Sequence, residues 1–182
     1  MGAAIQKMFW GFIIVIVDFT ISQFDIFVDL IGYIFVLNGL RQLQSKNQSF
    51  VAASKFTMVL AVLSIFNLVP VETNVATLVP STTFINNLIF SAIDSLIHLA
   101  LVGHILQGLI KVAEEHHKHL ALTLESRLKL YVITAFALLA ITPFILNVPE
   151  ETGRIMITII AIMGTFIELI FLYMLWKFKS IV

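Results

Sequence analysis

The stretch from Thr83 to Ile110, TFINNLIFSAIDSLIHLALVGHILQGLI, is almost entirely apolar. It is long enough for one helix to cross a lipid bilayer, which takes about 20 residues. Within it, Asp94 and His98 are four residues apart, which places them on the same face of that helix. A carboxylate and an imidazole are costly among lipid tails and therefore face protein or water. The stretch predicts a membrane-spanning helix that carries polar side chains near its centre.

The composition of the whole chain also indicates a membrane protein. Of its 182 residues, 59% are hydrophobic and 12% are charged, whereas a soluble domain is about 45–50% apolar and about 25% charged. The mean hydropathy is +1.01. Zero net charge gives no indication of nucleic-acid binding, and the lack of cysteine excludes disulfides and thiolate chemistry. We expect one integral membrane domain over residues 1–182, without a cofactor.

Six hydrophobic segments predict an all-α fold, a bundle of transmembrane helices. The last four are long enough to cross a bilayer. The first two are short and are separated by little more than Gln23, so they form either a tight transmembrane hairpin or a re-entrant pair. Pro143 is expected to kink the fifth helix. The segments are Ile5–Ser22, Phe24–Leu40, Phe50–Val71, Thr83–Ile110, Leu128–Val148 and Ile155–Trp176.

The basic residues predict the orientation of this bundle. Cytoplasmic connections of membrane proteins are enriched in Lys and Arg. With six spans, Arg154 falls on one side together with Glu72, Glu150 and Glu151, and every other Lys and Arg falls on the opposite side. We therefore expect both termini to be cytoplasmic. The residues on the expected cytoplasmic side are Lys7, Arg41, Lys46, Lys55, Lys111, Lys118, Arg127, Lys129, Lys177 and Lys179.

Polar side chains form a stripe on the expected fourth helix. Asn87, Ser91, Asp94 and His98 recur at intervals of three or four residues, which is the spacing of one helix face. At a rise of about 1.5 Å per residue, Asp94 lies near the middle of a hydrocarbon core about 30 Å thick. This stripe is expected to face protein or water.

Three further acidic residues, Asp18, Asp29 and Glu168, lie within expected spans, and no Lys or Arg lies at the same depth. An isolated charge there costs about 2.5–3.5 kcal/mol. These carboxylates and Asp94 are therefore protonated, hydrated, paired with His98 or bound to a cation. One interpretation is a site for a cation, proton or small solute. The other is a set of interhelical hydrogen bonds that hold the bundle together.

Motifs for metal binding and catalysis are weak. His116 and His119 have the spacing of two metal ligands on a helix, although a hydrated extension of the fourth helix over Lys111–His119 is the favoured interpretation. The chain contains no His-Glu-x-x-His, Gly-x-Ser-x-Gly or glycine-rich phosphate loop. The run EETGR at 150–154 is similar to the paired-glutamate motif of membrane CAAX-type proteases, but its arginine is one position too close. No catalytic residue is predicted.

The segment FDIFVDLIGYIFVLNGLRQL, Phe24–Leu43, resembles part of a family of small, uncharacterised multi-pass membrane proteins of Gram-positive bacteria. In that family Phe-Asp-Ile-x-x-Asp-x-Ile-Gly-Tyr precedes an apolar run and Gly-Leu. Asp25, Asp29, Gly32 and Tyr33 match, whereas Val28 stands where proline is common. The resemblance implies a bacterial cytoplasmic membrane and no established activity. Acids at this helix start would face its positive dipole end, and Gly32 would permit close helix approach.

These observations support three functional hypotheses. The first is a membrane protein that binds or transports a small solute or cation, with proton coupling as an extension, either alone or as a subunit of a larger transporter. Six helices in 182 residues also match the size of substrate-binding subunits of vitamin importers of the energy-coupling-factor type. The second is a non-catalytic immunity, assembly or signalling subunit, with a membrane partner or a second copy of itself. The third is an intramembrane enzyme acting on lipid.

Overall fold

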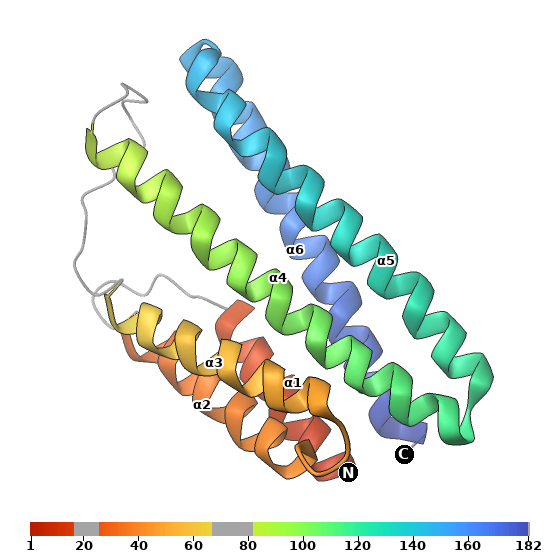
Figure 1. The fold of residues 1–182 in the computed structure, drawn as a ribbon. Coiled ribbons are helices and arrows are strands. Elements are labelled where there is room, and N and C mark those ends of the chain that lie inside the picture. The colour runs from red at the N-terminus through yellow and green to blue at the C-terminus, as the bar shows by residue number, and fades with distance from the viewer. Residues whose placement is uncertain (17–25, 67–81, 182) are drawn as a thin grey trace.

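The computed structural model describes residues 1–16, 26–66 and 82–181, and within them it is all-helical. The expectation of an all-α fold is confirmed. Six α helices and one 3-10 helix follow one another along the chain (Figure 1). They are α1 (Gly2–Ile16), α2 (Ile26–Leu43), α3 (Gln48–Phe66), α4 (Thr82–His116), α5 (Lys118–Ile141), η1 (Thr142–Asn147) and α6 (Glu150–Ile181).

The helices pack in chain order, and α6 returns to contact α1, so the six form a closed ring. Helices α4, α5 and α6 are longer than the first three and extend well beyond them at one end of the molecule (Figure 1). The N- and C-termini lie together at the other end. The molecule therefore has a six-helix end near the termini and an opposite end built mainly from the long helices.

Four of the described helical stretches are long and apolar enough to cross a membrane, while α1 is apolar but shorter. Side chains on their outer surfaces, such as Ile133, Phe136 and Ile162, are about 60–68% exposed. Extended exposed apolar surface of this kind is suited to lipid rather than water. The described helices are thus compatible with a membrane protein, as the composition is. The stretches are Gln48–Ile65, Ile89–Glu115, Lys118–Asn147 and Glu150–Ser180.

Small residues let the backbones of α1 and α2 approach closely. A Cβ atom added at Gly11 would lie 2.6 Å from the carbonyl oxygen of Gly32, and one added at Gly39 would lie 2.6 Å from that of Ala4. Ala4 and Gly11 are seven residues apart on α1, as are Gly32 and Gly39 on α2, so the two contacts form one antiparallel seam. Such small-residue contacts are a common basis of helix packing in membranes. The expected role of Gly32 is confirmed.

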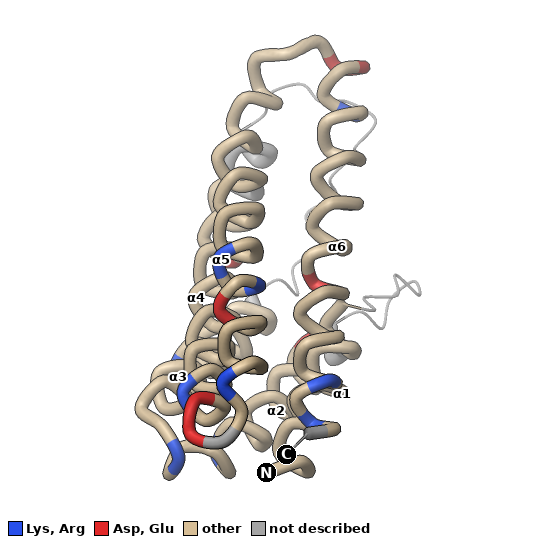
Figure 2. Tube along the Cα trace, turned by 90° about the vertical axis from the view of Figure 1, so that its right-hand side faces the viewer, with Lys and Arg blue, Asp and Glu red and all other residues tan. Residues whose placement is uncertain are grey.

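Charged side chains are divided between the two ends of the molecule (Figure 2). Lys and Arg gather toward the end that holds both termini, where some acidic residues also lie, whereas the start of α6 at the opposite end carries two acids (Figure 2). Glu150 and Glu151 lie in the first turn of α6, at the positive end of its dipole, and Arg154 Nη2 lies 2.5 Å from Glu150 Oε1. The charge distribution on which the orientation was predicted is therefore a property of the folded molecule.

The helix changes type at Pro143. The fifth α helix stops at Ile141, and a 3-10 helix with proline in its first turn follows directly over Thr142–Asn147. Proline has no N–H to donate, and its ring clashes with the carbonyl four residues earlier, which disfavours the α-helical pattern there. The kink expected at Pro143 stays a prediction.

The hydrophobic core lies at the end of the molecule that holds the termini. Fully buried side chains there include Met8 of α1, Leu40 of α2, Ile105 of α4 and Phe178 of α6. Toward the opposite end the packing loosens, since Leu96 of α4 is 47% exposed. The polar residues of α4 lie where the closed core gives way to this more open half.

Candidate functional site

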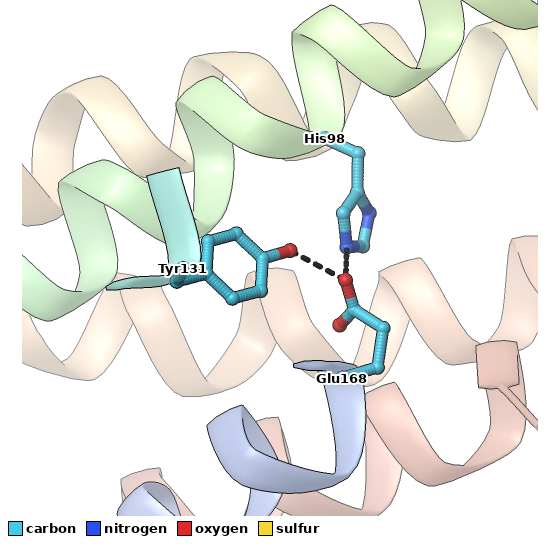
Figure 3. Close-up of polar contacts among 3 residues, drawn as sticks. All are labelled: His98, Tyr131 and Glu168. Carbon is cyan, nitrogen blue, oxygen red and sulfur yellow. Dashed lines mark hydrogen bonds and ion pairs between the residues drawn. The ribbon is translucent and has the colours of Figure 1, made fainter. Parts of the chain in front are cut away.

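Three helices meet at the carboxylate of Glu168, which projects from α6 (Figure 3). The hydroxyl of Tyr131, from α5, donates a hydrogen bond to its Oε1. The Nε2 atom of His98, from α4, lies 3.2 Å from the same oxygen. This second contact is a hydrogen bond when the imidazole is neutral and an ion pair when it is protonated. We call His98, Tyr131 and Glu168 the three-helix cluster.

Two buried phenylalanines close the core side of this cluster. The ring of Phe12, from α1, meets that of His98 edge-on with centroids 6.0 Å apart, and meets that of Phe171 edge-on at 4.9 Å. Phe171 in turn contacts the ring of Tyr131 at 6.2 Å. Both phenylalanines are fully buried. Since edge-to-face aromatic packing fixes ring orientation, these contacts hold the imidazole and the phenol in place.

A cavity of about 250 Å³ opens on the other side of the cluster, between α4, α5 and the middle of α6. Its polar lining consists of the three-helix cluster together with Asp94, Ser95 and Thr142. The remaining wall is mostly apolar, and no Lys or Arg belongs to the lining among the described residues. The second carboxylate oxygen of Glu168, Oε2, is buried and has no hydrogen-bond partner within the described part of the chain. The apolar residues of the wall include Leu99, Leu138, Ile160 and Ile167.

The cluster lies deep in the long helices. Tyr131 and Glu168 are each about 20 Å along their helices from the end that holds the termini. On α5 this length includes the ten residues that precede the apolar run beginning at Leu128. A carboxylate at this depth needs polar partners or water, and the cluster and the cavity provide the surroundings in which it can be tolerated.

The structure brings together part of the predicted set of polar residues. Asp94, His98 and Glu168 line one cavity. Asp29 lies in the first turn of α2, close enough to interact electrostatically with His98. Ser91 is exposed and does not belong to the described lining of the cavity. Asp18, as well as the side chain of Asn87, lies outside the described residues.

The histidines after α4 do not keep the spacing expected of a helical metal site. Helix α4 ends at His116, His117 has non-helical backbone angles (φ −143°, ψ 69°), and α5 begins at Lys118. His116 and His119 therefore belong to different helices, and the expected continuous extension through His119 was wrong. The side chain of His116 is outside the described part of the structure. Among the described residues, no group of three or more His, Asp or Glu is arranged to hold a metal ion.

Sequence reasoning missed Tyr131, although the sequence contained a signal. Tyr131 lies in the apolar run that begins at Leu128, two residues after Lys129. A buried tyrosine hydroxyl usually finds a hydrogen-bond partner, and Tyr131 is 3% exposed. The pattern indicated a need for an acceptor on another helix. It did not indicate that the acceptor is Glu168.

Comparison of the chain with protein-family models, with curated proteins and with solved structures finds no match.

Proposed function

We propose that this chain is a multi-pass protein of a bacterial cytoplasmic membrane that binds a small cationic solute in the cavity between α4, α5 and α6, and moves it across the bilayer. The observation that carries the proposal is the convergence of Asp94 and the three-helix cluster on one cavity at membrane depth. Two carboxylates without Lys or Arg in the described lining favour a positive ligand. A volume of about 250 Å³ suits an inorganic ion with water or a small amine.

The polar groups of α3 show what purely structural polar residues look like in this protein. The hydroxyls of Ser54 and Thr57 donate to backbone carbonyls of their own helix at 2.9 Å and are buried in the core. Hydroxyls satisfied in this way need no cavity. Asp94 and Glu168, in contrast, border a cavity. This difference supports a binding role over one of helix attachment alone.

The proposal extends to topology and coupling. We place both termini in the cytoplasm and let all six helices cross the membrane, because Lys and Arg gather at the end that holds the termini (Figure 2). His98 is the residue suited to exchange protons during transport, since imidazole titrates near neutral pH and its Nε2 lies 3.2 Å from Glu168. The chain acts alone or as the membrane subunit of a larger transporter.

Replacing Asp94 with asparagine is expected to lower cation uptake by about tenfold or more, because the amide removes a negative charge at similar size. The measurement is the uptake of radioactive rubidium and methylammonium into proteoliposomes that contain the purified full chain. Glu125→Gln is the matched control, since Glu125 is exposed, pairs with Lys129 and lies outside the cavity.

Proton coupling is tested by imposing a pH gradient across the membrane of the same vesicles. His98→Ala should abolish the effect of this gradient on cation uptake.

Uptake equal to that of protein-free vesicles, or equal uptake by wild type and Asp94→Asn, would contradict the proposal. If Asp94→Asn and His98→Ala are also tolerated in cells while the chain purifies with a larger membrane protein, the function is that of a non-transporting partner. Folding of each variant is checked by its helical circular dichroism before transport is compared.

A further inference from the structure

A second concave site lies on the lipid-facing surface between α5 and α6, in the half of the molecule that holds the termini. It has a volume of about 350 Å³, and it shares no described lining residue with the cavity that contains Asp94. We call it the basic groove. Its walls are apolar over most of their length, and they are formed by Leu120, Leu124, Phe166, Leu169, Ile170 and Met174.

Two positively charged residues, Arg127 of α5 and Lys177 of α6, also line the basic groove. Neighbouring basic residues have partners, since Lys129 Nζ lies 2.8 Å from Glu125 Oε1 and Lys179 Nζ lies 5.1 Å from the ring centroid of Trp176. Neither Arg127 nor Lys177 forms an ion pair with any described acidic residue. The groove thus offers two positive charges that the described part of the protein does not neutralise.

The length of the groove matches one leaflet of a bilayer. From Lys177 to Phe166 it extends roughly 16 Å along α6, and half of a hydrocarbon core is about 15 Å. Phe166 and Leu169 on its wall are 58% and 53% exposed. Lys177 lies at the end of the groove nearest the termini, and Arg127 lies about halfway along it. These two cations and the exposed apolar side chains toward the middle of the molecule complement an amphiphile with a negative headgroup.

We propose that the basic groove binds one anionic phospholipid of the leaflet on the side of the termini. Arg127 and Lys177 contact the headgroup phosphate, and one acyl chain lies between α5 and α6 against Leu169. Basic pockets between transmembrane helices on the cytoplasmic side are suited to such headgroups. A lipid bound there contacts both of the helices that line the groove.

A neighbouring groove supplies an internal comparison. It lies between α1 and α6, has a volume of about 480 Å³ and shares Leu169 and Tyr173 with the basic groove. No Lys or Arg belongs to its described lining. A lipid in this groove between α1 and α6 meets no basic side chain of the described lining that could contact its phosphate. It should therefore exchange without preference for one headgroup.

The test is native mass spectrometry of the delipidated full chain in detergent, titrated with dioleoyl phosphatidylglycerol or dioleoyl phosphatidylcholine. The first phosphatidylglycerol should bind wild type at least tenfold more tightly than phosphatidylcholine, because each basic side chain contributes about fivefold. The double variant Arg127→Gln/Lys177→Gln should lose this preference. Lys46→Gln/Lys55→Gln, which removes two exposed charges at the same end of the molecule, should keep it.

Three results would overturn the assignment. Equal affinity of wild type for the two lipids would remove the headgroup site. Equal loss of preference in both double variants would reduce it to general attraction between charges. Displacement of the bound lipid by excess glycerol 3-phosphate would assign the two cations to a soluble anion. None of these variants alters the cavity between α4, α5 and α6, so the result is independent of whether the chain transports a cation.

Discussion

Gly32→Ala is expected to lower the free energy of unfolding by about 1–3 kcal/mol, the usual cost of overpacking. A Cβ atom at this position would lie 2.6 Å from Val15 Cγ2 and 2.8 Å from the carbonyl oxygen of Gly11. The valine side chain can rotate, but the carbonyl belongs to the backbone of α1 and cannot move without it. The two helices must therefore separate along their seam, and the change propagates to Phe12 beneath the three-helix cluster.

The measurement for Gly32→Ala is equilibrium unfolding in mixed detergent micelles, followed by circular dichroism. Gly103→Ala is the matched control, since Gly103 is also a buried helical glycine but no described atom lies within 4 Å of an added Cβ. That control should be unchanged or more stable by up to about 1 kcal/mol, because alanine favours the helix. Equal effects at the two glycines would mean that the close approach of α1 and α2 does not contribute to stability.

Glu168→Ala is expected to abolish ligand binding and also to destabilise the fold by about 1–3 kcal/mol. Its removal leaves the Tyr131 hydroxyl and His98 Nε2 without their shared acceptor, and a donor left unsatisfied at this depth carries a desolvation cost. Glu168→Gln separates the two consequences. The amide oxygen still accepts from Tyr131, so the protein should unfold near the wild-type midpoint, but the loss of charge should still prevent cation binding.

Unfolding in mixed micelles and uptake of methylammonium into proteoliposomes are the paired measurements for Glu168. Glu125→Gln makes the same chemical change at a residue whose side chain is 48% exposed. This control should change neither the unfolding midpoint nor the uptake of methylammonium. A Glu168→Gln protein that still takes up methylammonium at the wild-type rate would show that the cluster serves packing alone.

Much of the architecture could be predicted because hydrophobic runs of bilayer length leave few alternatives to helices. The segment expected over Thr83–Ile110 appears within α4. Helix ends were predicted less well. Polarity marks where a chain leaves the membrane, whereas α5 begins at Lys118, ten residues before the apolar run at Leu128. A helix can continue into water at no cost to its backbone hydrogen bonds.

The composition of the cavity could be predicted only in part. Four-residue spacing on one helix placed Asp94 and His98 together, because that relation is fixed by helix geometry. Whether Glu168 and Tyr131 lie beside His98 depends on how α5 and α6 pack against α4. The periodicity of one segment does not indicate which residues of the neighbouring helices it contacts. The seam between α1 and α2 had a clearer signal, since small residues seven apart occur on both helices, but only Gly32 was predicted to take part.

The cavity beside the three-helix cluster is expected to contain water at membrane depth. Because the chain has no cysteine, single cysteines can be introduced without first removing others. Their rate of reaction with a charged methanethiosulfonate reagent is measured in lipid vesicles, with the reagent present on both sides of the membrane. Thiols react as thiolates, which requires water. Ser95→Cys lines the cavity, whereas Ile133→Cys lies on the outer surface of α5, 68% exposed, at a depth close to that of Tyr131. We predict that the cysteine at 95 reacts on the order of tenfold faster or more than the one at 133, with both reacting fully after unfolding in SDS. Equally slow reaction of the two cysteines in the folded protein would show that the cavity is closed to water.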